Sequence, residues 1–317
     1  MLRKLIVPGL ALAATAITAA TAAAPAAAHP GHGSSSAQGG AQSVQQAPDA
    51  YFAATLLGKN EVKAPGTKVG DKDGIALAVF RIHGNKVEYA VRWQGTAAPT
   101  AFHIHQGVKG RNGDVKIGFF MGSALPGTLS AVKGSVTVND GALLNRIRNN
   151  PAGWYANLHT GEFPGGAVRA QLHRIKPVHL DTVLATGSRS TLTAIADGRQ
   201  EVPAAGTKVG DKNGKAVWLV WVKGTKVHFA TVWKNIAQPT LAHIHKAPKG
   251  KNGPVVVDFF SAPSGLPAGV NGIAGTGTAS SSVAKGIKKN PKNWYTNLHT
   301  SEFPGGAVRG QLHGGGW

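Results

Sequence analysis

The sequence carries one stretch twice, first as Asn157-Leu-His-Thr-Gly-Glu-Phe-Pro-Gly-Gly-Ala-Val-Arg-Ala-Gln-Leu-His173 and again as Asn297-Leu-His-Thr-Ser-Glu-Phe-Pro-Gly-Gly-Ala-Val-Arg-Gly-Gln-Leu-His313. The offset is 140 residues, and 18 of 23 positions are identical between 151–173 and 291–313. Apolar and polar residues alternate on both sides of Phe-Pro-Gly-Gly, where proline fixes φ and glycine permits a positive φ. The stretch therefore predicts a β-hairpin in each copy.

The repetition extends over most of the chain. Glu61 matches Glu201 and Trp93 matches Trp233, and we expect the offset of 140 to hold from end to end. A period this long indicates a duplicated domain and not a solenoid unit. The expected organisation is a signal peptide, a disordered linker, a first domain, a connector and a second domain, over residues 1–28, 29–50, 51–173, 174–190 and 191–313.

Each copy consists of short alternating runs that are separated by turn residues. In the first copy they predict strands at 52–57, 75–82, 86–93, 100–105, 115–120, 135–138, 154–159 and 167–173. One short helix is expected at 142–149, where Pro151 stops it, with a counterpart at 282–289. The predicted fold class is all-β, with two tandem β-sandwich or Greek-key barrel domains, each with one short helix.

The first residues predict the compartment. Arg3 and Lys4 precede an apolar, alanine-rich run and a small-residue cleavage site near Ala28, the pattern of a secretory signal peptide. We therefore expect a secreted, extracellular protein without a transmembrane anchor. The sequence has no cysteine, which excludes disulfides, thiolate metal ligands and cysteine nucleophiles.

The formal net charge is +20. A basic balance favours an acidic extracellular polymer or a protein as partner, whereas scattered lysines and arginines equally fit a solvated surface. Both interpretations stay open, and the oligomeric state stays undetermined. No motif indicates specific nucleic-acid binding, and neither a Gly-x-Ser-x-Gly elbow nor a dinucleotide fingerprint occurs. A non-enzymatic role without catalytic residues is therefore favoured.

Paired histidines give the sharpest chemical signal. His103-Ile-His105 lies in a predicted strand, so both imidazoles share one face. His159 on the hairpin can complete a three-nitrogen site for copper or zinc. The second copy offers His243, His245 and His299 in the same pattern. The alternative is that each histidine stabilises the fold through a hydrogen bond.

Further polar residues recur in both copies. Arg169 is expected to form an ion pair with Glu61 or with Glu162, and a ligand-binding carboxylate is the alternative. The loop at 71–74 is expected to be a turn and not a calcium loop, because the later glutamate is missing. The recurring positions outside the three-histidine pattern are Glu61, Glu162, Arg169, Gln171, His173, Glu201, Glu302, Arg309, Gln311 and His313.

Taken together, these motifs resemble the chordin-type (CHRD) domain over nearly all of 51–173 and 191–313. The resemblance implies an extracellular β-rich module. It carries over to Glu61, His103, His105, Asn157, His159, Thr160, Arg169 and Gln171 and to their partners in the second copy. Two departures stand out: Lys63 replaces a proline, and Gly-Ala-Val-Arg replaces Gly-Glu-Ile-Arg, which removes an acidic residue beside Arg169 and Arg309.

The His-x-His pair with a later histidine is also similar to copper/zinc superoxide dismutase. That similarity implies a Greek-key fold in which His103, His105 and His159 would hold copper. The disulfide cysteines of that family are absent. The similarity therefore supports the fold more than the activity.

Overall fold

The computed structural model describes residues 47–186 and 192–315. The predicted signal peptide at 1–28, with its cleavage near Ala28, and most of the predicted linker lie outside the described residues. The strands of the first repeat are β1 (Ala50–Leu57), β2 (Ile75–His83), β3 (Lys86–Gln94), β4 (Pro99–Gln106), β5 (Val115–Met121), β6 (Leu129–Thr137), β7 (Trp154–Thr160), β8 (Val168–Gln171) and β9 (His173–Ile175).

The second repeat has the same strand order. Its strands are β10 (Leu192–Asp197), β11 (Lys215–Lys223), β12 (Lys226–Lys234), β13 (Pro239–Lys246), β14 (Val255–Ser261), β15 (Val270–Thr278), β16 (Trp294–Thr300), β17 (Val308–Gln311) and β18 (His313–Gly314). Short 3-10 helices span Gly58–Asn60, Pro151–Gly153, Gly198–Gln200 and Pro291–Asn293. The all-β class that the sequence predicts is confirmed.

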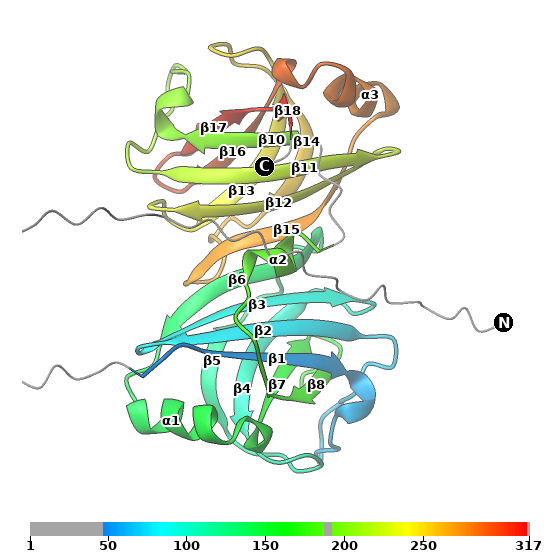
Figure 1. Ribbon diagram of the computed structural model, residues 1–317. Coiled ribbons are helices and arrows are strands. Elements are labelled where there is room, and N and C mark those ends of the chain that lie inside the picture. Colours follow the sequence, from blue (N-terminus) through cyan, green and yellow to red (C-terminus); the bar gives the residue numbers. More distant parts are fainter. Residues whose placement is uncertain (1–46, 187–191, 316–317) are drawn as a thin grey trace, which may run out of the picture. The chain divides into compact units, whose positions relative to one another are not determined.

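Each repeat is a sandwich of two antiparallel layers (Figure 1). In the first repeat, one layer has the order β6-β3-β2-β1 and the other has the order β8-β7-β4-β5. Strand β1 joins the layers, because it also pairs with β9 and, through Leu57 and Arg169, with β8. Apolar side chains from both layers fill the space between them, so polar side chains that share a strand with them must face outward.

One nine-residue helix closes each sandwich, as expected. Helix α1 (Gly141–Asn149) begins at Asp140, whose side chain accepts a hydrogen bond from the backbone N–H of Leu143 at 2.8 Å. Ser280 caps α3 (Ser281–Lys289) in the same way. Leu144 and Ile147 of α1 are buried in the core. The pattern of one short helix per repeat is therefore confirmed.

The connector contains a further helix, α2 (Asp181–Leu184), that the sequence analysis missed. Its Val183 and Leu184 are buried, and Arg92 of β3 donates hydrogen bonds to the carbonyls of both residues. The connector therefore packs on the outer face of the first domain's sheet.

Strand β6 pairs antiparallel with β15 of the other repeat. Val132 lies opposite Ile273 and Ala131 opposite Ala274, with Leu184 of α2 packed on the two alanines. The two domains thus share a continuous hydrogen-bonded sheet at this point.

Three details of the sequence prediction were wrong. The strand expected at 135–138 begins at Leu129, because it pairs with β15 as well as with β3. The strand expected at 167–173 is divided into β8 and β9, because the chain leaves β7 and continues along β1. The offset of 140 rises to 141 between β6 and β15 and returns to 140 at the helices.

Candidate metal centre

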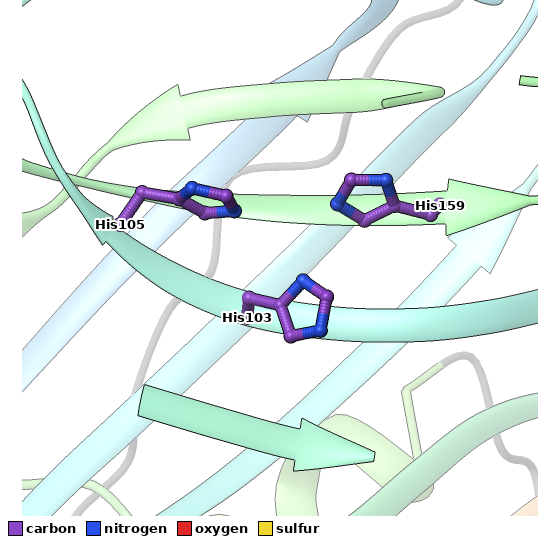
Figure 2. A group of neighbouring side chains, drawn as sticks. All are labelled: His103, His105 and His159. Carbon is purple, nitrogen blue, oxygen red and sulfur yellow. The ribbon is translucent and has the colours of Figure 1, made fainter. Parts of the chain in front are cut away.

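Strand β4 separates an apolar face from a histidine face. Phe102 and Ile104 are buried in the core, whereas His103 and His105 point to the other side of the layer. Strand β7 lies next to β4 and brings His159 to the same side (Figure 2). One ring nitrogen from each of the three histidines lies within 4.8 Å of the other two. Strand periodicity and the β4–β7 pairing thus assemble the predicted cluster.

The second domain repeats the cluster with His243, His245 and His299, whose ligand atoms meet the same 4.8 Å limit. Here Nδ1 of His243 lies 3.2 Å from Nε2 of His299. The structure therefore brings together all six histidines that the sequence assigned to the two candidate sites.

Backbone carbonyls fix the tautomers of two rings in each cluster. Nδ1 of His105 donates to the carbonyl of Gly113 at 2.9 Å, and Nδ1 of His159 donates to that of Pro164 at 2.9 Å. A carbonyl only accepts, so Nδ1 carries the proton and Nε2 keeps its lone pair. Among the described residues, neither Nε2 has a hydrogen-bond partner. The first cluster therefore holds buried nitrogen lone pairs that protein groups leave unused. In the second cluster Nε2 of His245 is likewise unpaired, whereas Nε2 of His299 faces Nδ1 of His243 at 3.2 Å.

Burial keeps the rings neutral. His103 is 7% exposed, and desolvation, together with the neighbouring His159 and His105, lowers its pKa to about 4. The same causes lower the pKa of His243 to about 3, and burial also lowers the pKa of His105 and His159. At neutral pH these imidazoles are in the form that binds metal.

Arg169 supports the cluster through the residues that contact His105. Its side chain is buried, and its guanidinium carbon lies 3.3 Å from the centre of the Tyr155 ring, on which His105 also stacks at 4.7 Å. Arg169 also donates to Oδ1 of Asn112 and to the carbonyl of Arg111. It thereby fixes the glycine-rich loop whose Gly113 carbonyl orients His105. Arg309 and Tyr295 repeat the arrangement at 3.4 Å.

Gln171 and Gln311 are structural. Nε2 of Gln171 donates to the carbonyls of Gly107 and Ala152, both at 2.8 Å. Gln311 makes the equivalent bonds to Ala247 and Lys292. These amides tie the glycine-rich loop to the start of β7 and of β16.

Glu61 lies against Gly166 and Asn157. Burial raises its pKa to about 7, against the opposing effects of the Arg169 charge and of a hydrogen bond from Asn157. Glu201 in the second domain has the same pKa for the same reason. These half-buried carboxyls contact the strands that carry the site.

The ion pair expected between Glu162 and Arg169 is wrong. Glu162 pairs instead with Lys68 at 2.7 Å, and Glu302 pairs with Lys208 at 2.8 Å. Both carboxylates lie at the surface, on the turn of the hairpin. They are therefore too exposed to neutralise the buried arginines.

His173 and His313 do not join the clusters. Both are exposed at the start of β9 and β18, and His313 contacts Oγ1 of Thr193 at 3.1 Å. The turn expected at 71–74 is confirmed, since Oδ1 of Asp71 accepts from the backbone N–H groups of Asp73 and Gly74 at 3.2 Å.

Sequence reasoning missed Tyr155 and Asp258. Tyr155 recurs as Tyr295 in the repeated hairpin, which is a signal that could have been used. It was interpreted only as one residue of an alternating strand pattern. Oδ1 of Asp258 lies 3.6 Å from Nε2 of His243, but its counterpart is Gly118, so comparison of the copies gave no signal.

Comparison with known families agrees with this architecture. The family model of the CHRD domain matches residues 52–172 and again 192–312. No curated protein and no solved structure matches the chain. CHRD domains are typically extracellular binding or structural modules. In the described part of the chain, every helix is too short or too polar to cross a membrane. The chain therefore belongs to the CHRD domain family and carries two tandem copies of that domain.

Proposed function

We propose that each CHRD domain of this protein binds one zinc or copper ion through its three histidines. In the first domain the ligands are His103, His105 and His159. In the second they are His243, His245 and His299. Metal binding would then be the specific activity of this extracellular-type module.

The observation that carries this proposal is the set of buried, unpaired nitrogens. In the described structure, the Nε2 atoms of His105 and His159 and both ring nitrogens of His103 lack a hydrogen-bond partner. A buried polar atom without a partner costs about 1–3 kcal/mol. Three such atoms facing one another are accounted for if they coordinate an ion. A histidine whose two ring nitrogens both formed hydrogen bonds would have no lone pair left for an ion.

The spacing suits a first-row metal. Zinc–nitrogen bonds of about 2.0–2.1 Å place two nitrogens of a tetrahedral site roughly 3.4 Å apart. The 3.2 Å between Nδ1 of His243 and Nε2 of His299 is already close to this value. The carbonyls that hold Nδ1 of His105 and His159 are the outer partners that metal-bound histidines usually have.

The test is metal titration of the full secreted chain after chelator treatment. We expect about two equivalents of zinc or copper to bind, and about one after either His105→Ala or His299→Ala. The matched control is His173→Ala with His313→Ala, which removes two exposed histidines outside the clusters. Failure of the wild type to bind either metal stoichiometrically, or an equal loss in the control, would refute the proposal.

A second candidate function is binding of an acidic extracellular polymer by the second domain. A groove beside α3 is lined by Lys246, Lys289 and Trp294, and the ammonium of Lys246 lies 5.7 Å from the Trp294 ring centre. The first domain has Gln106 and Asn149 at the positions of the two lysines. This local concentration of positive charge favours an anionic ligand.

Polyglutamate binding as a function of salt concentration tests this candidate. We expect Lys246→Gln with Lys289→Asn, which copies the first domain, to weaken binding and its salt dependence. Lys59→Gln with Lys86→Gln, which removes two exposed lysines of the first domain, is the control. Equal weakening by both double variants would point to overall charge and contradict a specific groove.

A further inference from the structure

One of the differences between the neighbouring strands β5 and β14 places a carboxylate beside the second histidine cluster. Asp258 of β14 lies directly opposite His243 of β13, whereas Gly118 of β5 lies opposite His103 of β4. All three histidines, the stacked tyrosine and the buried arginine are the same in both domains. A carboxylate therefore lies beside only one of two sites whose histidines, tyrosine and arginine match.

The ring of His243 presents a different nitrogen to each side. Nδ1 lies 3.2 Å from Nε2 of His299, inside the cluster, and Nε2 lies 3.6 Å from Oδ1 of Asp258, outside it. Since Nδ1 of His299 donates to the Pro304 carbonyl, Nε2 of His299 accepts, and Nδ1 of His243 carries the proton without metal. A metal that binds Nδ1 must displace that proton, and the neutral ring then carries it on Nε2.

We propose that Asp258 stabilises the metal-bound form of His243 by accepting the hydrogen bond from Nε2, so that the second domain binds its metal more tightly than the first. This inference rests on the proposed function. The aspartate is a positioning residue and not a ligand, because it faces the nitrogen that points away from the cluster. Its side chain is 67% exposed, so it can rotate to shorten the 3.6 Å separation.

The first domain lacks this partner. A Cβ atom at Gly118 would lie 3.8 Å from Cδ2 of His103 and 3.6 Å from Cε of Met121. The outer edge of His103 therefore faces a glycine and the end of an apolar side chain. Both distances are ordinary van der Waals contacts, so the position can accept a larger residue without a backbone shift.

Exchange of the two residues tests the inference. Gly118→Asp is placed in a chain whose second site is removed by His299→Ala, and Asp258→Gly in a chain whose first site is removed by His159→Ala. Competition titration with Zn²⁺ and a chromophoric chelator gives the affinity of each remaining site. Outer partners of metal-bound histidine typically change affinity by about 10–100-fold. We expect about a 10-fold gain from Gly118→Asp and about a 10-fold loss from Asp258→Gly.

Two further measurements separate positioning from general stability. Asp258→Glu should restore most of the affinity that Asp258→Asn removes, while the unfolding midpoints of the metal-free variants stay equal. The visible bands of Co²⁺ at the second site should shift in Asp258→Asn, because the basicity of a ligand changes.

The outcomes distinguish this inference from the proposed function. If the two sites bind zinc with equal affinity, and neither Gly118→Asp nor Asp258→Gly changes that affinity, the inference is overturned and the proposed function stands. The absence of zinc, copper and cobalt binding from both sites would overturn both proposals.

Discussion

The two domains differ most in their aromatic cores and least around their histidines. On the histidine side, His103, Tyr155 and Arg169 recur unchanged in the second copy. In the core, Phe102 is matched by Ala242 and Ala78 by Trp218, and all four side chains are fully buried. The three-histidine pattern is therefore kept in both domains, whereas the large aromatic side chain of the core comes from a different strand in each.

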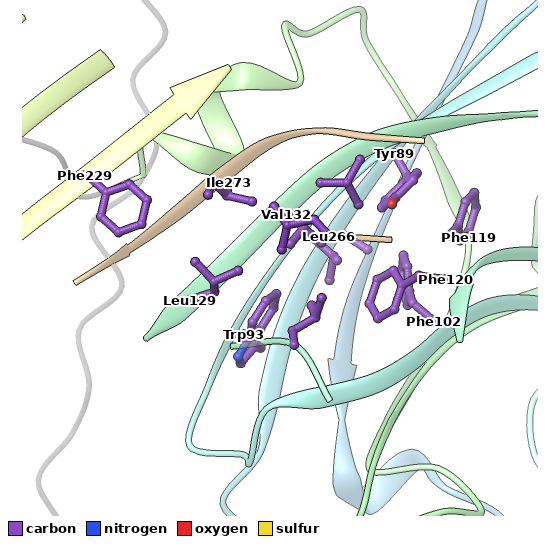
Figure 3. Packing of buried hydrophobic residues seen from close by; sticks show 14 of the residues in the cluster. Tyr89, Trp93, Phe102, Phe119, Phe120, Leu129, Val132, Phe229, Leu266 and Ile273 are labelled. Atoms are coloured by element: carbon purple, nitrogen blue, oxygen red, sulfur yellow. The ribbon is translucent and has the colours of Figure 1, made fainter. Parts of the chain in front are cut away.

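The core exchange conserves filled space. Phe102 lies 5.2 Å from Phe119 and 6.0 Å from Tyr89, between ring centres (Figure 3). Trp218 lies 5.7 Å from Phe259 and 5.9 Å from Phe229, the counterparts of those two rings. A ring from β11 thus replaces a ring from β4 against the same neighbours.

The core face and the histidine face therefore differ in which substitutions they can accept. A core needs apolar volume, which several combinations of residues can supply. A cluster of lone pairs needs particular atoms in particular directions, which only histidine supplies here.

The largest expected loss of stability comes from removing the Trp218 ring from the core of the second domain. Trp218→Ala should destabilise the protein by about 4 kcal/mol, because it leaves a cavity between Phe229 and Phe259. Adding Ala242→Phe, as in the first domain, should recover a substantial part of that loss. Urea unfolding of the two single variants and the double variant measures the coupling. Strictly additive effects would contradict the idea that the two rings fill the same space.

Arg169→Ala tests the histidine side. We expect a loss of about 3 kcal/mol in the free energy of unfolding, because the loop carbonyls and Asn112 lose a buried donor. Arg169→Lys should not restore stability, since an ammonium cannot reproduce the planar stacking and the fork of hydrogen bonds. Lys59→Ala is an exposed control. Full rescue by lysine would show that charge alone matters at this position.

The pH dependence of stability tests the half-buried carboxyls of Glu61 and Glu201. The pKa of Glu61 is raised from 4.5 to about 7, so the folded state binds more protons between these values. The contribution of each such carboxyl to stability is therefore present at low pH and is lost as pH rises through about 7, on the order of 2 kcal/mol per group between pH 5 and 8. Glu61→Gln with Glu201→Gln removes this contribution. The cluster histidines, whose pKa is lowered, change stability in the opposite direction over part of the same range, so the quantity to compare is the free energy of unfolding of the wild type minus that of the double variant in urea. This difference should fall as pH rises, and a difference that rises would contradict the assignment.

The smallest effect is expected at Tyr89. Its hydroxyl is buried without a hydrogen-bond partner among the described residues, and burial raises its pKa. The second copy has Phe229 at this position. Tyr89→Phe should therefore stabilise the first domain by about 1 kcal/mol or less, measured as a rise in unfolding midpoint. Phe229→Tyr is the reciprocal variant, and it should destabilise the second domain.

The sequence predicted the histidine clusters because they depend on local rules. Residues His103 and His105 share a strand face by periodicity, and the repeated hairpin drew attention to His159. The strand from Leu129 was partly missed, because Gly134 and Ser130 interrupt its alternation and its pairing partner belongs to the other repeat. The alternation of residues within one segment does not show which distant strand will pair with it.

The remaining gaps have the same cause. Helix α2 is short, and its position depends on Arg92, far away in the chain. The expected pairing of Glu162 with Arg169 considered only proximity within the hairpin, whereas Lys68 approaches Glu162 from another loop. Asp258 lies opposite His243 on a neighbouring strand, and the first repeat has a glycine at the matching position. Neither the local pattern nor the comparison of the repeats therefore indicates it.

The pairing of β6 with β15 bears on aggregation, because it covers one sheet edge in each repeat. A strand at the edge of a sheet exposes unpaired backbone groups, which recruit strands from other molecules. Here each repeat covers the edge of the other over residues 129–134 of β6 and 270–275 of β15. A single repeat cut out at the connector would present this edge to solvent, and we expect it to self-associate where the tandem chain does not.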